Sequence, residues 1–393
     1  MATWMAKFDF LVIGGGIAGA SVAATLAGEA RVMLLEAEDQ PGYHSTGRSA
    51  ALFSEIYGNA TIRALSRASR SFLFDPPVDF TDQPLVRPRG TLFMASATQM
   101  ERLAAFAALP DVAPATQLLT PAEMKLLCPV LRDDYIAGGL HEPLSMDLEV
   151  HELHHGYIRQ CRRRGGVLSM NARVTSIARR KGEWQVTAGG EELSAAVLIN
   201  AAGAWADEIA AMAGVQSVGL QAHRRTAVLV AAPADTIIDR WPLLIDIDEQ
   251  FYVKPDAGFL LLSPADETPT EPCDAQPEQI DIAIAVHRAE EAMILDVRSI
   301  KHSWAGLRNF VSDRTPVVGY EPSADGFFWL AGQGGYGIQI APALARAAAA
   351  LALGRSLPED LTAWGVTADA IAPGRLRTLE QASGAISARA HAG

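Results

Sequence analysis

The fold is decided by residues 8–36, FDFLVIGGGIAGASVAATLAGEARVMLLE. The apolar run at residues 8–13 is typical of a buried parallel strand. A glycine turn follows, then a helix of small residues over 20–27 and a second strand over 31–36. This order predicts a Rossmann-like unit. The uncharged residues 10–28 are therefore expected to be a strand, a turn and a helix, with no stable insertion into a membrane.

Each part of this unit suits a dinucleotide. Gly14 permits a tight turn, Gly16 lets backbone N–H groups approach a pyrophosphate, and Gly19 lets the helix pack closely on the strand. The helix N-terminus places its positive dipole end at the phosphates, and Ile17 and Ala18, in the turn before it, are expected to contact the cofactor. The second strand ends in Glu36 and Ala37, where a carboxylate accepts hydrogen bonds from a ribose diol. The acid favours FAD or NAD over NADP.

Two further segments favour FAD. The polar loop GYHSTGRSAA, residues 42–51, follows the second strand and can wrap a second phosphate and the flavin edge. A second glycine turn, GQGGYGIQ at residues 332–339, precedes an alanine-rich helix. The cofactor-binding residues expected in these two segments are Ser45, Thr46, Gly47, Arg48, Ser49, Ala50, Gly334, Gly335, Tyr336, Gly337, Ile338 and Gln339.

These motifs resemble the D-amino-acid oxidase superfamily of FAD enzymes, and residues 42–51 bring the chain closest to the D-arginine dehydrogenase group. The resemblance extends from Asp9 to about Ala345. It implies an α/β fold (α+β overall), with a Rossmann-like FAD-binding domain and a β-sheet substrate-binding domain. The first domain would comprise residues 1–60, 148–225 and 303–393, and the second residues 61–147 and 226–302. FAD would be non-covalent, since no cysteine lies near either glycine turn.

The resemblance also assigns residues to the site. Val174 would meet the adenine, and the stretch NAAGAWA would return the chain to the cofactor through Ala202, Gly203 and Trp205. Arg225 and Arg308 would hold the substrate carboxylate, with Arg308 also beside the cofactor. The other substrate residues implied are Tyr57, Glu249, Tyr252 and the backbone of Gly335, whose carbonyl would receive the substrate amine.

The implied activity is oxidative deamination of D-amino acids to 2-oxo acids, by hydride transfer from the α-carbon to flavin N5. The chain departs from D-arginine-preferring members at two positions. Thr91 stands where they carry a glutamate and Leu52 where they carry a histidine, which indicates a neutral or apolar D-amino acid or a secondary amine. Two alternatives stay open: an FAD oxidase or dehydrogenase of a secondary amine or 2-hydroxy acid, and a non-catalytic flavin-binding protein.

Composition limits the partners. The formal net charge of −12 disfavours a nucleic acid. Three widely separated cysteines, with no targeting signal evident, predict a reduced, cytoplasmic protein. The predicted partner is a small-molecule amino acid, with a quinone or oxygen as the electron acceptor.

One competing motif is HELHH, residues 151–155, which matches the H-E-x-x-H pattern of zinc enzymes. On a helix, His151 and His155 share a face. No third ligand is evident in the sequence, and so short a pattern recurs by chance. We therefore expect an exposed helix face and no metal site.

Overall fold

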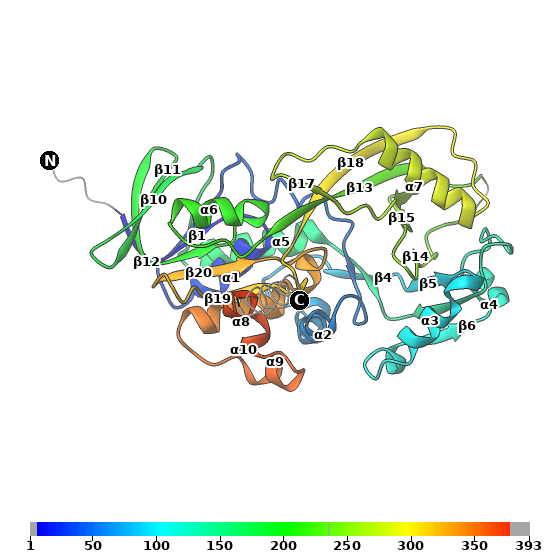
Figure 1. Cartoon of the computed structure of the whole chain (residues 1–393), viewed down its shortest axis with the longest axis horizontal. Coiled ribbons are helices and arrows are strands. Elements are labelled where there is room, and N and C mark those ends of the chain that lie inside the picture. Colours follow the sequence, from blue (N-terminus) through cyan, green and yellow to red (C-terminus); the bar gives the residue numbers. More distant parts are fainter. Residues whose placement is uncertain (1–5, 235, 378–393) are drawn as a thin grey trace, which may run out of the picture.

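Two large sheets lie at opposite ends of the long axis of the protein (Figure 1). The structure is a computed structural model that describes residues 6–234 and 236–377. Residues 1–5 and 378–393 of the predicted FAD-binding domain lie outside the described residues. A short third sheet joins the segment after residue 50 to two later segments; its strands are β3 (Leu52–Phe53), β8 (Met146–Leu148) and β4 (Val86–Pro88).

The first sheet is the predicted Rossmann-like unit with antiparallel additions. Its central strand β1 pairs in parallel with β2 and β12, and β12 pairs in parallel with β20. The strands are β1 (Ala6–Ile13), β2 (Val32–Leu35), β9 (Val167–Ser169), β10 (Val174–Arg180), β11 (Glu183–Ala188), β12 (Glu191–Asn200), β19 (Val317–Tyr320) and β20 (Phe327–Ala331). Helices cover one face of the parallel strands and a second apolar cluster covers the other, so both faces of these strands are apolar where they are buried, as in residues 10–13, 32–35 and 327–331.

The helices beside this sheet share one apolar core, which contains residues of α1 (Ile17–Leu26), α2 (Ala60–Phe74), α5 (Val150–Arg163) and α8 (Gly337–Ala352). Polar contacts fix α2 on α8: Gln339 Nε2 donates to Ser66 Oγ at 2.9 Å, and the N–H of Ala343 donates to Ser69 Oγ at 3.1 Å. The other helices are α3 (Met100–Ala107), α4 (Pro121–Leu127), α6 (Ala206–Met212), α7 (Gln279–Ala292), α9 (Glu359–Ala363) and α10 (Ala368–Ile371).

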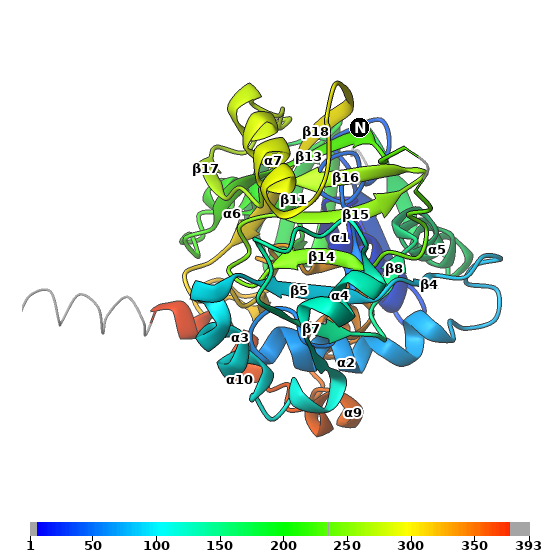
Figure 2. The same ribbon diagram turned by 90° about the vertical axis from the view of Figure 1, so that its right-hand side faces the viewer.

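The second sheet is mainly antiparallel, and Figure 2 shows its strands stacked from β16 through β15, β14 and β5 to β7. Its strands are β5 (Thr91–Ala95), β6 (Gln117–Leu119), β7 (Gly138–Glu142), β13 (Gln221–Ala231), β14 (Leu243–Asp246), β15 (Tyr252–Asp256), β16 (Phe259–Ser263), β17 (Thr268–Thr270) and β18 (Ile300–Phe310). Alternate residues face opposite sides. Leu92 and Leu244 pack in one cluster, which also contains residues of α7, while Phe93 and Ile245 pack in another.

The predicted fold class is confirmed. Residues 146–148 form β8, the central strand of the short third sheet, and α5 begins just after it at Val150. The predicted domain boundaries at residues 225 and 303 fall inside β13 and β18, which pair with each other. The division at those residues stays a prediction. In the described ranges, no helix is both long and apolar enough to cross a membrane.

The turn between β1 and α1 leaves no room for a side chain. Gly14 has φ +107°, and a Cβ on Gly19 would lie 1.8 Å from the carbonyl oxygen of Gly14. We expect Gly19→Ala to push α1 away from β1 and to lower the free energy of unfolding by about 3 kcal/mol. Chemical denaturation measures this effect. Gly28→Ala is the control, since a Cβ there meets only Arg164 at an ordinary 3.6 Å; equal losses in both variants would contradict the packing argument.

Candidate active site

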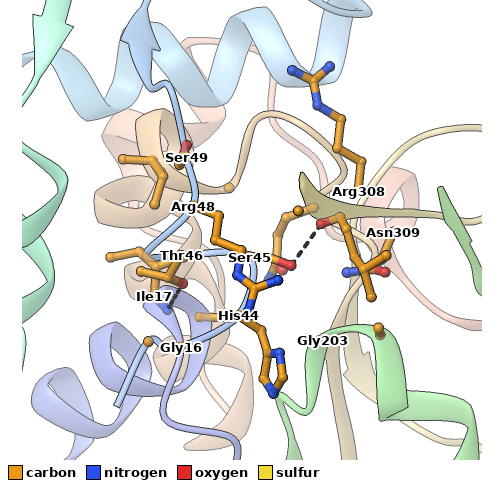
Figure 3. A pocket seen from close by; sticks show the side chains of 18 of the residues that line it. Gly16, Ile17, His44, Ser45, Thr46, Arg48, Ser49, Gly203, Arg308 and Asn309 are labelled. Atoms are coloured by element: carbon orange, nitrogen blue, oxygen red, sulfur yellow. Dashed lines mark hydrogen bonds between the residues drawn. The ribbon is translucent and has the colours of Figure 1, made fainter. Parts of the chain in front are cut away.

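A cavity of about 360 Å³ runs from the carboxyl ends of β1 and β2 to the start of α8 and one face of the second sheet. Its walls come from segments far apart in the sequence. Figure 3 shows Gly16 and Ile17 at one side, the loop from His44 to Ser49 across the middle, and Arg308 and Asn309 at the other side.

The turn after β1 presents backbone groups held by two side chains. The N–H of Ile17 donates to Thr46 Oγ1 at 3.0 Å, so Thr46 lies at the N-terminus of α1. Glu36 accepts from the N–H of Gly15 at 2.8 Å and from that of Glu38 at 3.0 Å. These bonds fix the Glu36 carboxylate at the end of β2, beside the cavity, where the sequence predicts a ribose contact.

The loop of residues 42–51 is fastened to the second sheet. Ser45 Oγ donates to the carbonyl oxygen of Leu307 at 2.7 Å (Figure 3). Arg48 donates to the carbonyl oxygens of Ala275 and Ala305, at 2.8 and 3.1 Å, and pairs with Asp274. The guanidinium of Arg48 therefore holds two parts of the chain together, a role that the sequence analysis did not predict.

Besides Arg225, three cavity-lining residues carry buried polar atoms without a hydrogen-bond partner: His44 Nδ1, Asn309 Oδ1 and Gln333 Nε2. The other ring nitrogen of His44 lies 3.1 Å from Glu38 Oε1, and its ring lies 4.6 Å from that of Trp205. Buried polar atoms are rarely left unpaired. Unpaired atoms on a cavity wall therefore suit a polar ligand. The sequence analysis missed all three residues, although His44 and Gln333 lie within the quoted motifs.

The second glycine turn makes room for neighbouring side chains. Gly334 has φ +55°, and a Cβ there would lie 2.0 Å from the ring of Phe310. A Cβ on Gly335 would lie 2.7 Å from the guanidinium carbon of Arg308. The backbone of Gly335 and the side chain of Arg308 thus meet directly, and both line the cavity at the start of α8.

Arg225 and Arg308 come together because β13 and β18 are antiparallel partners. Arg308 lies opposite His223, so Arg225 is its diagonal neighbour on the same face of the sheet. Gly306, opposite Arg225, adds no side chain between them. Arg224 faces the other side, where it bonds Asp281 of α7 at 2.9 Å. The strand pairing therefore sends only the second arginine of the Arg224–Arg225 pair into the cavity.

The two cavity arginines have different partners. Arg308 Nη1 lies 3.4 Å from the hydroxyl of Tyr57, which donates to Glu249 Oε2 at 3.2 Å. Arg225 Nη2 lies 3.1 Å from Glu267 Oε1. The Nε of Arg225 is buried and unpartnered. The N–H of Arg225 Nε is therefore available to an anionic ligand.

Their electrostatics differ as well. Burial and the charge of Arg308 lower the pKa of Arg225. Burial also acts to lower the pKa of Arg308, but the hydroxyls of Tyr57 and Tyr252 outweigh it, and the net pKa is raised. Two adjacent cations in a cavity favour an anionic ligand.

Most predicted site residues line this cavity. Those that do are Gly14, Gly16, Ile17, Ala18, Glu36, Ala37, Ser45, Thr46, Arg48, Ser49, Ala50, Tyr57, Val174, Ala202, Gly203, Trp205, Arg225, Tyr252, Arg308, Gly334, Gly335, Gly337, Ile338 and Gln339.

Four predicted residues do not line this cavity. Gly19 packs against Gly14, and the N–H of Gly47 closes its loop on the carbonyl of Gly42 at 2.7 Å. Tyr336 is buried with its ring 5.0 Å from that of Tyr57. Glu249 is exposed, and its carboxylate accepts a hydrogen bond from Tyr57, which lines the cavity.

The HELHH segment has a structural role at the first glycine turn. His154 is 3% exposed, and its Nε2 donates to the carbonyl oxygen of Gly15 at 2.8 Å. The expectation of an exposed face is wrong for this residue, which packs beneath Gly42. The rings of His151 and His155 lie 4.0 Å apart. Within residues 6–234 and 236–377, no cluster of three or more His, Cys, Asp or Glu side chains could hold a metal ion.

Comparison with known proteins now gives the class. The family described as FAD dependent oxidoreductase (DAO) matches residues 9–351, so the chain belongs to this family of FAD-dependent enzymes. Glycine oxidase from Geobacillus kaustophilus has the same fold, with a TM-score of 0.78 and 22% identity, covering 93% of this chain and 99% of that one.

Two curated relatives match parts of the chain. Mitochondrial dimethylglycine dehydrogenase of Rattus norvegicus is 25% identical over 268 residues, which are 66% of this chain and 31% of that protein. L-2-hydroxyglutarate dehydrogenase of Salmonella houtenae is 27% identical over 219 residues, 53% of this chain and 50% of that protein. The chain thus spans about a third of the first of these relatives and half of the second.

The residues that line the cavity are suited to binding FAD. One end has the glycine turn, the N-terminus of α1 and the Glu36 carboxylate; the other has the glycine turn before α8. The unpaired atoms of His44, Asn309 and Gln333 lie on its wall. The three cysteines do not line it, which agrees with the prediction of non-covalent binding.

The contact between His154 and Gly15 gives a pH-dependent stability. Burial lowers the pKa of His154 from 6.5 to about 4. A lowered histidine pKa in the folded state stabilises the fold fully above pH 6.5, and this contribution is lost as the pH falls through 4. Between pH 6.5 and 4, protonation of this histidine should lower the free energy of unfolding of the unmodified protein by about 3 kcal/mol. We expect the His154→Gln variant to lack this part of the pH dependence.

Denaturation curves at several pH values measure this difference. His151→Gln is the matched control, because His151 is an exposed histidine on the same helix and its variant should follow the unmodified protein. A His154→Gln variant with unchanged pH dependence would contradict the assignment.

Proposed function

We propose that the protein oxidatively deaminates D-amino acids to 2-oxo acids. The coarser statement, that it is an FAD-dependent oxidoreductase, follows from its family. The observation that supports an amino-acid substrate is the pair Arg225 and Arg308, which lies on one face of the second sheet beside the backbone of Gly335. Guanidinium groups bind carboxylates through paired, charge-assisted hydrogen bonds, so this pair would fix an α-carboxylate and orient the α-carbon.

The chain's own residues would hold FAD along the cavity. The Gly14–Gly16 turn and the N-terminus of α1 would bind the pyrophosphate, and Glu36 the ribose. The turn of Gly334 and Gly335 and the start of α8 would lie at the flavin end. Bound FAD supplies the two-electron acceptor for the hydride that leaves the substrate α-carbon.

The pair Arg225 and Arg308, called the clamp below, would also influence the charge of the substrate amine. Two cations already line this end of the cavity, while the carboxylates on its wall, Glu36, Glu38 and Glu208, belong to the end beside β2 and α6. Arg225 already pairs with Glu267, so the charge of Arg308, whose guanidinium lies against Gly335, would favour the neutral form of an amine bound there. The carbonyl oxygen of Gly335 would accept a hydrogen bond from it. Loss of the hydride gives an imine, and water hydrolyses the imine to the 2-oxo acid and ammonia.

The relatives favour a second candidate on the same clamp. Dimethylglycine and 2-hydroxyglutarate, after which the two curated relatives are named, both carry an α-carboxylate. The arginine pair would hold a secondary amine or a 2-hydroxy acid equally well. The D configuration rests on the resemblance of residues 42–51 to D-arginine dehydrogenases. A cytoplasmic location and a quinone or oxygen as electron acceptor are also part of the proposal.

Product analysis tests the proposal. The FAD-loaded protein is given D- and L-amino acids, N-methylated glycines and 2-hydroxy acids with an artificial electron acceptor. We expect 2-oxo acid and ammonia from D-amino acids only. Turnover of N-methylated glycines or hydroxy acids alone would overturn the substrate class, and no turnover of any compound would favour a non-catalytic flavin-binding protein.

The clamp makes a separate prediction. Arg308→Ala should raise KM about 100-fold, because a bidentate charged contact contributes about 2–3 kcal/mol, while the bound FAD content stays near that of the unmodified protein. Steady-state kinetics and the visible spectrum measure the two quantities. Arg346→Ala, which removes an arginine paired with Asp360 away from the cavity, is the control. An unchanged KM in Arg308→Ala would refute the clamp.

A further inference from the structure

Two hydroxyl residues lie among apolar side chains on the part of the cavity wall near the second sheet. Around the clamp, the wall includes Leu52, Phe93, Leu243 and Ile245. The two hydroxyl residues of this patch are Ser54 after β3 and Thr91 at the start of β5; each is 2% exposed. Thr91 shares its face with Phe93 because strand residues alternate, and β5 lies next to β14 in the sheet seen in Figure 2. The direction of the two hydroxyl protons decides what this patch binds.

The proton of Ser54 points at a buried acid. Ser54 Oγ donates to Glu142 Oε2 at 2.7 Å and accepts from the N–H of Ile56 at 3.3 Å. Glu142 lies opposite Thr91 in the pairing of β5 with β7, and its other oxygen accepts from the N–H of Glu55 at 2.8 Å. Since a hydroxyl has one proton and two lone pairs, Ser54 keeps one lone pair and no proton for a ligand.

The proton of Thr91 is also in use. Thr91 Oγ1 lies 2.7 Å from Ser145 Oγ. Ser145 Oγ also lies 3.3 Å from the carbonyl oxygen of Glu142, which can only accept, so both contacts are satisfied when Ser145 donates to that carbonyl and Thr91 donates to Ser145. Both lone pairs of Thr91 stay unused. The two hydroxyls on the wall can therefore accept hydrogen bonds but cannot donate them.

A cationic side chain does not suit this patch. Arg225 and Arg308 line the same cavity and repel a further cation. Glu142 does not line the cavity, and both of its carboxylate oxygens already accept hydrogen bonds. A neutral donor pays a smaller desolvation cost than an ammonium or guanidinium group on an apolar wall.

We propose that Ser54 and Thr91, oriented by Glu142 and Ser145, select α-amino acids whose side chain carries a neutral hydrogen-bond donor, a hydroxyl or a carboxamide. The inference rests on the proposed function, because it takes the substrate to be an amino acid held by Arg225 and Arg308.

Near-isosteric substrate pairs test this selection: D-threonine against D-valine, D-asparagine against D-leucine, and D-glutamine against D-methionine, with D-lysine as the cation. One hydrogen bond contributes about a factor of ten in affinity. In each pair whose side chains fit the cavity, we therefore expect kcat/KM to be about tenfold higher for the amino acid with the hydrogen-bond donor. We expect the lowest kcat/KM for D-lysine. Equal or higher values for the apolar partners would overturn the inference while leaving the proposed function intact. No oxidation of any amino acid would instead refute the proposed function.

Three variants locate the effect. Thr91→Val and Ser54→Ala should each reduce the donor-to-apolar ratio of kcat/KM about fivefold or more. Glu142→Gln places an amide where the acid lies; the amide nitrogen can donate to Ser54, which frees the serine proton, so the ratio should fall without loss of the hydroxyl. Thr362→Val, at an exposed threonine of α9, is the matched control.

The assays are run at about pH 8.5. Burial raises the pKa of Glu142 to about 7, so the acid is ionised at the pH of the assay. Circular dichroism and FAD content show that each variant is folded. Variants that are folded and keep the full ratio would contradict the roles of these residues.

Discussion

The antiparallel pairing of β13 with β18 is the constraint on which the site depends. Both strands extend from the first sheet's side of the molecule into the second sheet (Figure 1). Their register makes Arg225 and Arg308 diagonal neighbours and leaves Gly306 opposite Arg225. A slip of one residue would turn either arginine to the face of α7, where Arg224 already pairs with Asp281. Register therefore decides whether both arginines face the cavity.

The two glycine turns fix the ends of the same cavity for different physical reasons. At the first, Gly14 and Gly19 let backbone pack on backbone, which brings the N-terminus of α1 to the cavity. At the second, Gly334 and Gly335 make space for the side chains of Phe310 and Arg308. The second turn therefore belongs to the clamp as much as to the cofactor.

The elements that could be predicted from the sequence are those formed by residues close together in the chain. The strand, turn and helix of residues 8–36 carry their own periodicity and spacing, and the structure has them as β1, α1 and β2. The arginine clamp came from family resemblance, since no local pattern shows that residues 225 and 308 meet. The hydrogen bond of Ser54 to Glu142 spans 88 residues, and that of His154 to Gly15 spans 139. Such contacts depend on how sheets and helices pack, which short motifs do not encode.

The central claim is that one cavity holds FAD and an amino-acid carboxylate side by side. The most direct measurement is the visible absorbance of the FAD-loaded protein under anaerobic conditions while D-amino acids are added. The account predicts loss of the oxidised flavin absorbance with D-amino acids, and no loss when Arg308 is replaced by alanine at the same low substrate concentration. A protein that cannot be loaded with FAD, or whose absorbance no amino acid changes, would contradict it.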